Sequence, residues 1–182
     1  MGKTFDEITP ELSQWIDRQR MFFVATAPLA ANGHVNCSPK GGDAFRVLGP
    51  REIAYADLTG SGIETVAHLR ENGRVVLMFC AFEGGPKIIR LHGQAEAVEP
   101  GDESFSELKS HFPELVGLRT IIRMQVSRIS DSCGFAVPYY DFVAQREVLD
   151  NHAEKLGPEG LVEYRAKKNR LSIDGLPGLK GI

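Results

Sequence analysis

The stretch from residue 52 to residue 93 limits the possible folds more than any other part of the chain. Residues 52–58 read EIAYADL and form a short apolar strand, a glycine-spaced turn then opens a helix, and GRVVLMFCAFEGGPKIIRLHG supplies two more strands. The turn, Thr59-Gly60-Ser61-Gly62, places small residues and two hydroxyls directly before the helix. Backbone N–H groups at a helix N-terminus carry partial positive charge, and glycines let the chain approach a ligand closely. The turn is therefore a candidate phosphate site.

The same turn has a second interpretation, in which it only starts the helix. Ser61 to Glu64 fits a capping box, with Ser61 at the N-cap and Glu64 at position N3. A carboxylate at Glu64 would also repel a bound phosphate. The spacing of the two glycines matches neither a Walker P-loop nor a GxGxxG fingerprint. On the residues alone, both interpretations stay open.

Short strands joined by tight turns dominate the chain between residues 20 and 130. Hydrophobic patterning predicts about seven of them, at residues 21–27, 34–39, 45–48, 51–58, 74–82, 87–98 and 120–129. The turn signal Asn32-Gly33 and the other short connections indicate hairpins, so we expect an antiparallel sheet that closes into a barrel. The fold class is mainly β with helices.

Helices are predicted at both ends of the chain and at two places within it. They are expected at residues 10–20, at 62–71 with a stop at Asn72-Gly73, after Pro100, and from Val143 onward with a break at Gly157-Pro158. We expect one domain over residues 1–182, with the barrel at about 20–130 and a C-terminal helical extension at about 141–182. The final Gly/Pro-rich residues are expected to be a solvated tail, in which Ile173 and Leu176 are candidate anchors to a partner surface.

Composition excludes several classes of function. The net charge is −3 over 182 residues, so no overall positive field would attract nucleic acid or an anionic membrane, and no apolar run is long enough to span a bilayer. Cys37, Cys80 and Cys133 lie far apart, without CxxC or His/Cys ligand spacing, so neither a disulfide framework nor a metal site is predicted. We expect Cys37 and Cys80 to be buried. The first residues are acidic and lack a signal-peptide core, so we expect a cytoplasmic protein.

The residues alone point to one composite anion pocket. It would join the Ser38-Pro39-Lys40 loop, the turn from Thr59 to Thr65, and Lys87. The histidines are scattered and do not suggest a Ser/His/Asp triad, so no catalytic acid or base is assigned. Trp15 belongs to an apolar helical stripe and is expected to pack in the core rather than to stack on a ligand.

Five segments in a fixed order carry a resemblance to a known family. FFVATA, GHVNCSPKGG, EIAYADLTGSG, ENGRVVLMF and KIIRLHGQAE, within roughly residues 5–130, resemble the pyridoxamine 5′-phosphate oxidase-like family of FMN-binding split-barrel proteins. The resemblance implies a split β-barrel of six or so antiparallel strands. It also implies a homodimer with FMN in two symmetric clefts between the subunits, and a small-molecule substrate.

The resemblance also implies roles for individual residues. Ser38 and Lys40 would lie beside the flavin ring and ribityl chain. The backbone of residues 55–58 would run along the isoalloxazine, and Lys87 falls where the family has a basic residue. The FMN phosphate would be held by Ser61, Gly62 and Thr65. The cofactor-binding residues implied in this way are Ser38, Lys40, Tyr55, Ala56, Asp57, Leu58, Ser61, Gly62, Thr65 and Lys87.

The chain departs from the oxidase itself at two places. Ile63 and Glu64 stand where the oxidase has two adjacent basic residues in its phosphate turn, so Lys40, Lys87 or a partner chain must supply the positive charge. The Trp-x-Arg-x-Arg-Leu segment that grips pyridoxamine phosphate is missing, and the chain ends instead in KKNRLSIDGLPGLKGI. Within that segment Lys168, Asn169 and Asp174 are candidate contacts over the flavin. We therefore expect a separate branch of the family.

Two functions of different classes remain. The first is an FMN-dependent oxidoreductase that acts on a small organic substrate. The second is a non-catalytic split-barrel protein that binds flavin, deazaflavin or haem for storage or sensing, with His34 or His92 as the candidate haem ligand. A homodimeric scaffold with an empty pocket is a third alternative.

Overall fold

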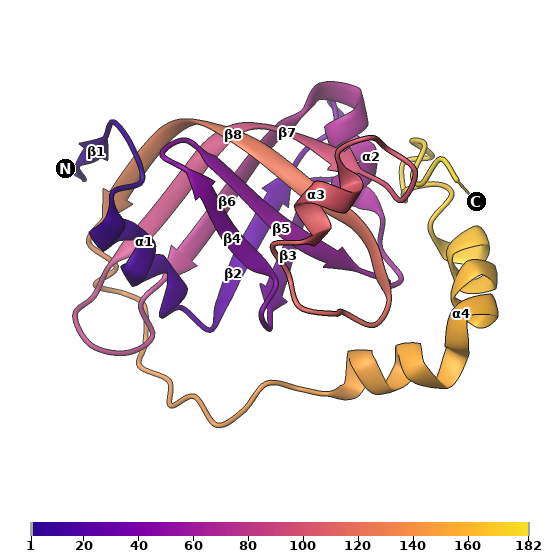
Figure 1. Ribbon diagram of the computed structural model, residues 1–182. Coiled ribbons are helices and arrows are strands. Elements are labelled where there is room, and N and C mark those ends of the chain that lie inside the picture. The colour runs from indigo at the N-terminus through magenta and orange to yellow at the C-terminus, as the bar shows by residue number, and fades with distance from the viewer. Residues whose placement is uncertain (1, 182) are drawn as a thin grey trace.

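An antiparallel sheet curled into a half-barrel forms the centre of the protein (Figure 1). The structure is a computed structural model and describes residues 2–181. The strands are β1 (Thr4–Phe5), β2 (Met21–Thr26), β3 (Asn36–Gly41), β4 (Phe45–Gly49), β5 (Glu52–Leu58), β6 (Arg74–Cys80), β7 (Ile88–Val98) and β8 (Leu118–Ser132). Their order across the sheet is β3-β2-β6-β7-β8-β5-β4, and β1 pairs with β8. The predicted split-barrel fold class is confirmed, although the short strand β1 was not foreseen.

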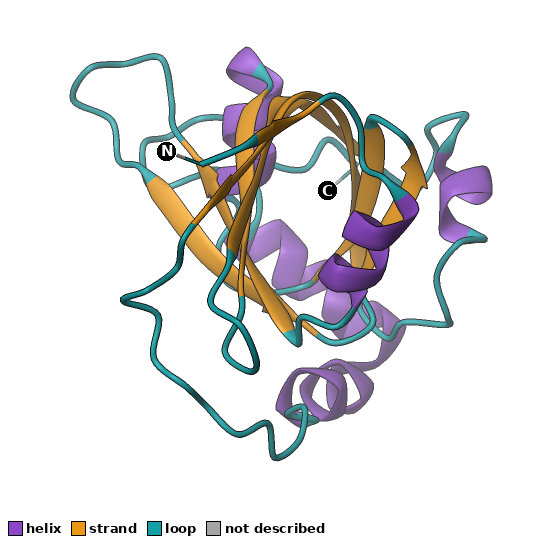
Figure 2. Ribbon diagram, turned by 90° about the vertical axis from the view of Figure 1, so that its left-hand side faces the viewer, coloured by secondary structure: helices purple, strands orange, loops and turns teal. Residues whose placement is uncertain are grey.

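The two edges of the sheet, β3 and β4, follow one another in the chain. Among the described strands, β3 pairs only with β2 and β4 only with β5. Figure 2 shows the strands curling around, which brings these edges toward each other without joining them. The barrel is therefore split between β3 and the β4–β5 hairpin, and side chains from β3 face those from β5 across the split.

Apolar side chains from both halves of the sheet fill the interior. Phe22, Phe45, Tyr55 and Phe79 form a cluster of aromatic rings whose centroids lie 5.1 to 5.6 Å apart. Trp15 packs against this core, as predicted. On β7 the ladder shifts register at Gly93, where a Cβ atom would lie 2.0 Å from the Gln125 carbonyl oxygen, so only glycine allows this approach.

Four helices surround the sheet within the described residues 2–181. They are α1 (Pro10–Asp17), α2 (Glu64–Asn72), α3 (Phe105–Lys109) and α4 (Val148–Lys168), the last with a kink at Gly157. Helix α2 ends as predicted, because Gly73 adopts a left-handed conformation with φ of 71°. Its start differs from the predicted capping box: Ile63 occupies the N-cap position and no side chain caps the helix. The capping-box interpretation of Ser61 is therefore wrong.

The region after β8 has two parts of opposite character. Residues 134–147, here called the C-terminal arm, are irregular and stand away from the barrel in both views (Figure 1, Figure 2). The helix expected from Val143 therefore starts later, at Val148. Residues 165–180, here called the C-terminal tail, fold back onto the barrel and bury Asn169 and Leu179. The expectation of a solvated tail is wrong, and Ile173, a predicted anchor, is exposed.

Two smaller expectations concern cysteines and the membrane. Cys80 is buried as predicted, but Cys37 is exposed because it points outward from the edge strand β3. Among residues 2–181 there is no helix with the length and apolar character needed to cross a bilayer.

Candidate functional site

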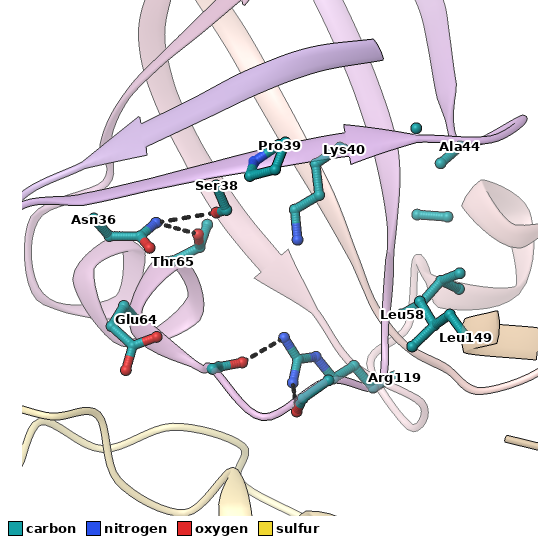
Figure 3. Close-up of a pocket in the computed structure, with 14 residues that line it drawn as sticks. Asn36, Ser38, Pro39, Lys40, Ala44, Leu58, Glu64, Thr65, Arg119 and Leu149 are labelled. Atoms are coloured by element: carbon teal, nitrogen blue, oxygen red, sulfur yellow. Dashed lines mark hydrogen bonds between the residues drawn. The ribbon is translucent and has the colours of Figure 1, made fainter. Parts of the chain in front are cut away.

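A cavity of about 280 Å³ lies at the split of the barrel (Figure 3). Its walls come from β3, the end of β5, the turn before α2, the start of β8 and the first turn of α4. The polar side chains that line it are Asn36, Ser38, Lys40, Glu64, Thr65 and Arg119, and the apolar wall is formed by Ala44, Ala56, Leu58 and Leu149. The cavity thus combines an apolar side with a polar, mainly basic side.

A buried ion cluster lies beside this cavity. The Lys40 ammonium donates to Asp57 Oδ1 at 2.9 Å, and Arg119 Nε donates to Asp57 Oδ2 at 2.7 Å. The Asp57 side chain is 1% exposed. Burial alone would raise the pKa of Asp57, but the charges of Lys40 and Arg119 and their hydrogen bonds lower it to about 2. Asp57 is therefore ionised at neutral pH, and two cations facing one carboxylate leave a net charge of +1.

Arg119 also fixes the turn that precedes α2. Its Nη1 donates to the carbonyl oxygen of Gly60 at 3.1 Å, and its Nη2 donates to the carbonyl oxygen of Gly62 at 2.8 Å. Figure 3 shows the Arg119 guanidinium with its hydrogen bonds to these two carbonyl oxygens. The partial negative charges of both oxygens are thereby neutralised, and an approaching anion meets a cation at this wall.

Two hydroxyl groups face the cavity from the opposite wall. Asn36 Nδ2 donates to Thr65 Oγ1 at 3.0 Å and to Ser38 Oγ at 3.3 Å. Each hydroxyl accepts a hydrogen bond from Asn36 and keeps its own O–H as a donor. Each hydroxyl is thus available to donate to a ligand oxygen. Glu64, nearby, accepts a hydrogen bond from the backbone N–H of Ile173 at 3.3 Å.

The structure brings most of the predicted cofactor residues to this one cavity. Six of them line it: Ser38, Lys40, Ala56, Leu58, Gly62 and Thr65. Asp57 is buried behind Lys40 as its ion partner. Tyr55 is fully buried in the aromatic core, and Ser61 is exposed and does not line the cavity. The contact of these residues with FMN stays a prediction.

Lys87 does not belong to this cavity. Its ammonium lies 4.9 Å from the centre of the Trp15 ring and 5.9 Å from that of Phe5. Lys87 directly precedes β7. At the other end of that strand, Val98 pairs with the same β8 residue as Ala56, which lies close to the turn. Eleven residues of β7 therefore separate Lys87 from the turn. The prediction that Lys87 shares one pocket with the turn is therefore wrong for residues of the same chain.

Two residues of the site, Asn36 and Arg119, were not predicted from the sequence. Asn36 shares a strand face with Ser38 and Lys40 at spacing of two, and this alternation was a usable signal. Arg119 carries no local signal, because it reaches Asp57 only through the pairing of β5 with β8, where Asp57 lies opposite Thr120. Strand register of this kind is a tertiary property.

The histidines suggested as haem ligands lie outside the cavity lining. His34 Nδ1 is 2.6 Å from Asp174 Oδ1, and the His34 backbone N–H donates to the same carboxylate at 2.8 Å. This bonding lowers the pKa of Asp174. Burial lowers the pKa of His92, and the neighbouring charges of Arg128 and Arg90 add to this effect. Within residues 2–181, no group of three or more His, Cys, Asp or Glu side chains is arranged to hold a metal ion.

Of the three tail residues predicted to contact the flavin, one lies at the site and two do not. Asn169 is fully buried and bonds to both Arg119 and Gly60, whereas Lys168 is exposed. Asp174 bonds to His34 instead of facing the cavity. Only Asn169 therefore reaches the site.

Comparison with known proteins gives the family. Residues 8–133 match the family model described as pyridoxamine 5′-phosphate oxidase. A curated relative from Aspergillus flavus, the pyridoxamine 5′-phosphate oxidase family protein ustO, is 38% identical over an aligned length of 192 residues, gaps included. The alignment covers 96% of this chain and 77% of the relative. Two crystal structures of HupZ from Group A Streptococcus share the fold, with a TM-score of 0.55, 22% and 24% identity, and coverage of 74% and 69% of this chain and 99% of theirs. The chain belongs to the pyridoxamine 5′-phosphate oxidase family.

Proposed function

We propose that this protein binds FMN in the cavity at the split of the barrel. The observation that carries the proposal is the convergence of Lys40 and Arg119, together with the hydroxyls of Ser38 and Thr65, on one cavity. A phosphate needs positive charge and hydrogen-bond donors, and an isoalloxazine ring needs apolar surface. The cavity offers both kinds of wall in one place.

Charge around the turn supports the proposal. Lys40, Arg119 and Arg165 are three cations, Asp57 and Glu64 are two carboxylates, and the sum is +1. The first turn of α2 has no side-chain cap, so its backbone N–H groups lack that internal acceptor. Lys40 and Arg119 would thus replace the two adjacent basic residues that are missing from this turn.

We further propose that the bound flavin serves an oxidoreductase acting on a small organic substrate. When bound, a flavin supplies hydride and electron transfer, while the chain binds it, orients it and excludes water. In this protein Lys40 and Arg119 would hold the phosphate, and Ala56, Leu58 and Leu149 would cover apolar surface of the ligand.

One observation favours the second candidate, a non-catalytic flavin-binding protein. The titratable side chains lining the cavity are Lys40, Glu64 and Arg119. Lys40 and Arg119 are held in the ion cluster, and Glu64 accepts the bond from Ile173. Reduction of the bound flavin by nicotinamide cofactors or small organic donors separates the two candidates, because a binding protein would leave it oxidised with every donor.

We also propose a homodimer with the two cavities at the subunit interface. The exposed aromatic and aliphatic side chains of the C-terminal arm support it, since exposed apolar groups gain free energy when another surface covers them. Gel filtration with light scattering tests the oligomeric state. The cytoplasmic location remains a prediction, which cell fractionation tests.

The visible absorption spectrum of the purified protein, with identification of the released chromophore, tests FMN binding. We expect a yellow protein that releases FMN, or an apo-protein that takes it up. The Lys40→Gln variant should bind FMN about tenfold more weakly, since one charge-assisted contact is lost. Lys109→Gln, which removes an ammonium from an exposed ion pair, is the matched control and should bind normally. A colourless protein that also refuses added FMN would contradict the proposal.

A further inference from the structure

The C-terminal tail places a fully buried amide directly against the turn. Asn169 is 0% exposed. Its Oδ1 accepts from Arg119 Nη1 at 3.0 Å, and its Nδ2 donates to the Gly60 carbonyl oxygen at 2.9 Å. Arg119 and Gly60 are themselves hydrogen-bonded. The three groups form a closed ring of contacts, so a shift in any one of them disturbs the other two.

A second side chain of the tail holds the start of the same turn. Arg165 Nε donates to Thr59 Oγ1 at 2.8 Å, and its Nη2 donates to the Leu118 carbonyl oxygen at 3.1 Å. The Thr59 hydroxyl donates in turn to the Gly117 carbonyl oxygen at 2.7 Å. Burial and the nearby charge of Arg119 lower the pKa of Arg165. Two arginines of like charge are therefore held close together at this turn.

The backbone of the tail fixes Asn169 in this position. The Leu179 N–H donates to the Asn169 carbonyl oxygen at 2.9 Å, and the Gly178 N–H donates to the Arg170 carbonyl oxygen at 2.7 Å. A Cβ atom on Gly178 would lie 2.2 Å from the Asn169 oxygen and 2.8 Å from Ile63 Cγ1. The tail thus packs tightly on Ile63, the residue that follows the turn, and cannot shift without moving Asn169.

We infer that the C-terminal tail is part of the anion site: Asn169 and Arg165 position Arg119 and the Thr59–Gly62 turn, so that tail docking and phosphate binding are coupled. This inference rests on the proposed FMN site. The tail lies beyond residue 133, where the family match ends, so the inference concerns a segment that the family match does not cover. Asn169 and Arg165 are positioning residues that act through Arg119 and Thr59.

The coupling distinguishes this role from simple stabilisation of the fold. A tail that only stabilises the barrel would affect FMN and riboflavin binding alike, because the two ligands differ only in the phosphate. A tail that positions the phosphate turn should affect FMN alone. Coupling is also reciprocal, so FMN should protect the tail from proteolysis more than riboflavin does.

The test measures FMN and riboflavin affinity by quenching of flavin fluorescence in the full-length protein. Asn169→Ala should weaken FMN binding about tenfold and leave riboflavin binding unchanged. Gly178→Ala, which displaces the tail from its other side, should act in the same direction. Asn151→Ala, the same change at an exposed position of α4, is the control and should alter neither affinity. Equal losses for both ligands in the Asn169 and Gly178 variants, or no loss, would overturn the inference.

A second readout needs no flavin. In the apo-protein, Asn169→Ala should speed hydrogen exchange at the amides of residues 59–63, while exchange within β6 and β7 stays slow. If the wild-type protein binds neither flavin, the proposed FMN site fails, but faster exchange in the turn still upholds the positioning role of the tail. Unchanged exchange at the turn would refute that role whether or not flavin binds.

Discussion

The C-terminal arm and the C-terminal tail lie in one segment of chain but relate to the barrel in opposite ways. In the tail, Asn169 and Ser172 are polar and yet 0% and 7% exposed, and the Asn169 side chain bonds to Arg119 and to Gly60 of the turn. In the arm, Phe135, Tyr139 and Val143 are apolar and yet 81%, 77% and 92% exposed. Few contacts tie the arm down, among them the bond from the Tyr140 N–H to the Phe82 carbonyl oxygen at 3.1 Å.

The contrast separates two ways in which a C-terminal extension can serve a binding site. Buried polar groups are costly unless they are paired, so a segment that buries and pairs them holds one defined position. Exposed apolar groups have no partner within one chain and gain free energy when another surface covers them. We therefore assign the tail to the site of its own chain and propose the arm as the contact to a second copy.

Substitutions in the arm should give the largest effect. Phe135→Ser, Tyr139→Ser and Val143→Ser together should weaken the proposed dimer by at least about 4 kcal/mol, because each side chain contributes about 1.5 kcal/mol or more on burial. Light scattering at several concentrations measures the dissociation. Leu29→Ser with Val162→Ser, at apolar positions exposed elsewhere, is the control and should leave the dimer intact. A triple variant that dimerises like the wild type would remove the arm from the interface.

Substitution of Arg119 should have an effect nearly as large, but on the free energy of unfolding rather than on dimerisation. Arg119→Met leaves the buried Asp57 carboxylate with one cationic partner, and breaking a buried pair in this way costs about 3 kcal/mol. Urea unfolding measures the difference. Arg123→Met removes a more exposed partner of Glu52 and should cost no more than about 1 kcal/mol. Equal losses of stability in the two variants would show that the buried cluster around Asp57 stabilises the fold no more than an exposed ion pair does.

The ion cluster around Asp57 should also make the free energy of unfolding depend on pH, with a smaller effect than the loss of Arg119. The folded-state pKa of Asp57 is about 2, below its value in the unfolded chain, so its contribution is complete above about pH 4 and is lost as the pH falls through about 2. The stability difference between wild type and Asp57→Asn should therefore shrink by about 2 kcal/mol over this range. A difference that stays constant from pH 5 to pH 2 would argue against a strongly ionised Asp57.

The smallest expected effect is local to the tail. Gly178→Ala should lower global stability by only about 1 kcal/mol, since the docked tail can detach without unfolding the barrel. Limited proteolysis should nonetheless cut the variant faster after Lys167 or Lys168 than the wild type. A variant that resists cleavage as well as the wild type would show that the tail tolerates this side chain.

Local patterns predicted the strands and the end of α2, because alternation and a left-handed glycine act within a few residues. The start of α2 was less predictable. Serine is a residue type typical of helix N-caps, which suggested a cap at Ser61. In the structure Arg119, from a distant strand, holds the turn by donating to the carbonyl oxygens of the turn. The same limit explains why Ser38, Lys40 and Thr65 were foreseen while Arg119 was missed.

The position of the tail was the least predictable feature. Its composition, rich in Gly and Pro, is typical of a solvated end, and the contacts that dock it run from Asn169 to Gly60 and from Asp174 to His34. Partners more than a hundred residues apart leave no trace in local sequence patterns. Lys87 was misplaced for a related reason, since only the register of β7 shows at which end of the barrel it lies.

The most direct test of the central claim is a parallel titration of the apo-protein with FMN and with riboflavin. The two ligands share the ring and ribityl chain, so the ratio of their affinities isolates the phosphate. If Lys40 and Arg119 form the phosphate site, FMN should bind about a hundredfold more tightly, as expected for two charge-assisted contacts. Equal affinities, or no binding of either flavin, would contradict a phosphate site at the split of the barrel.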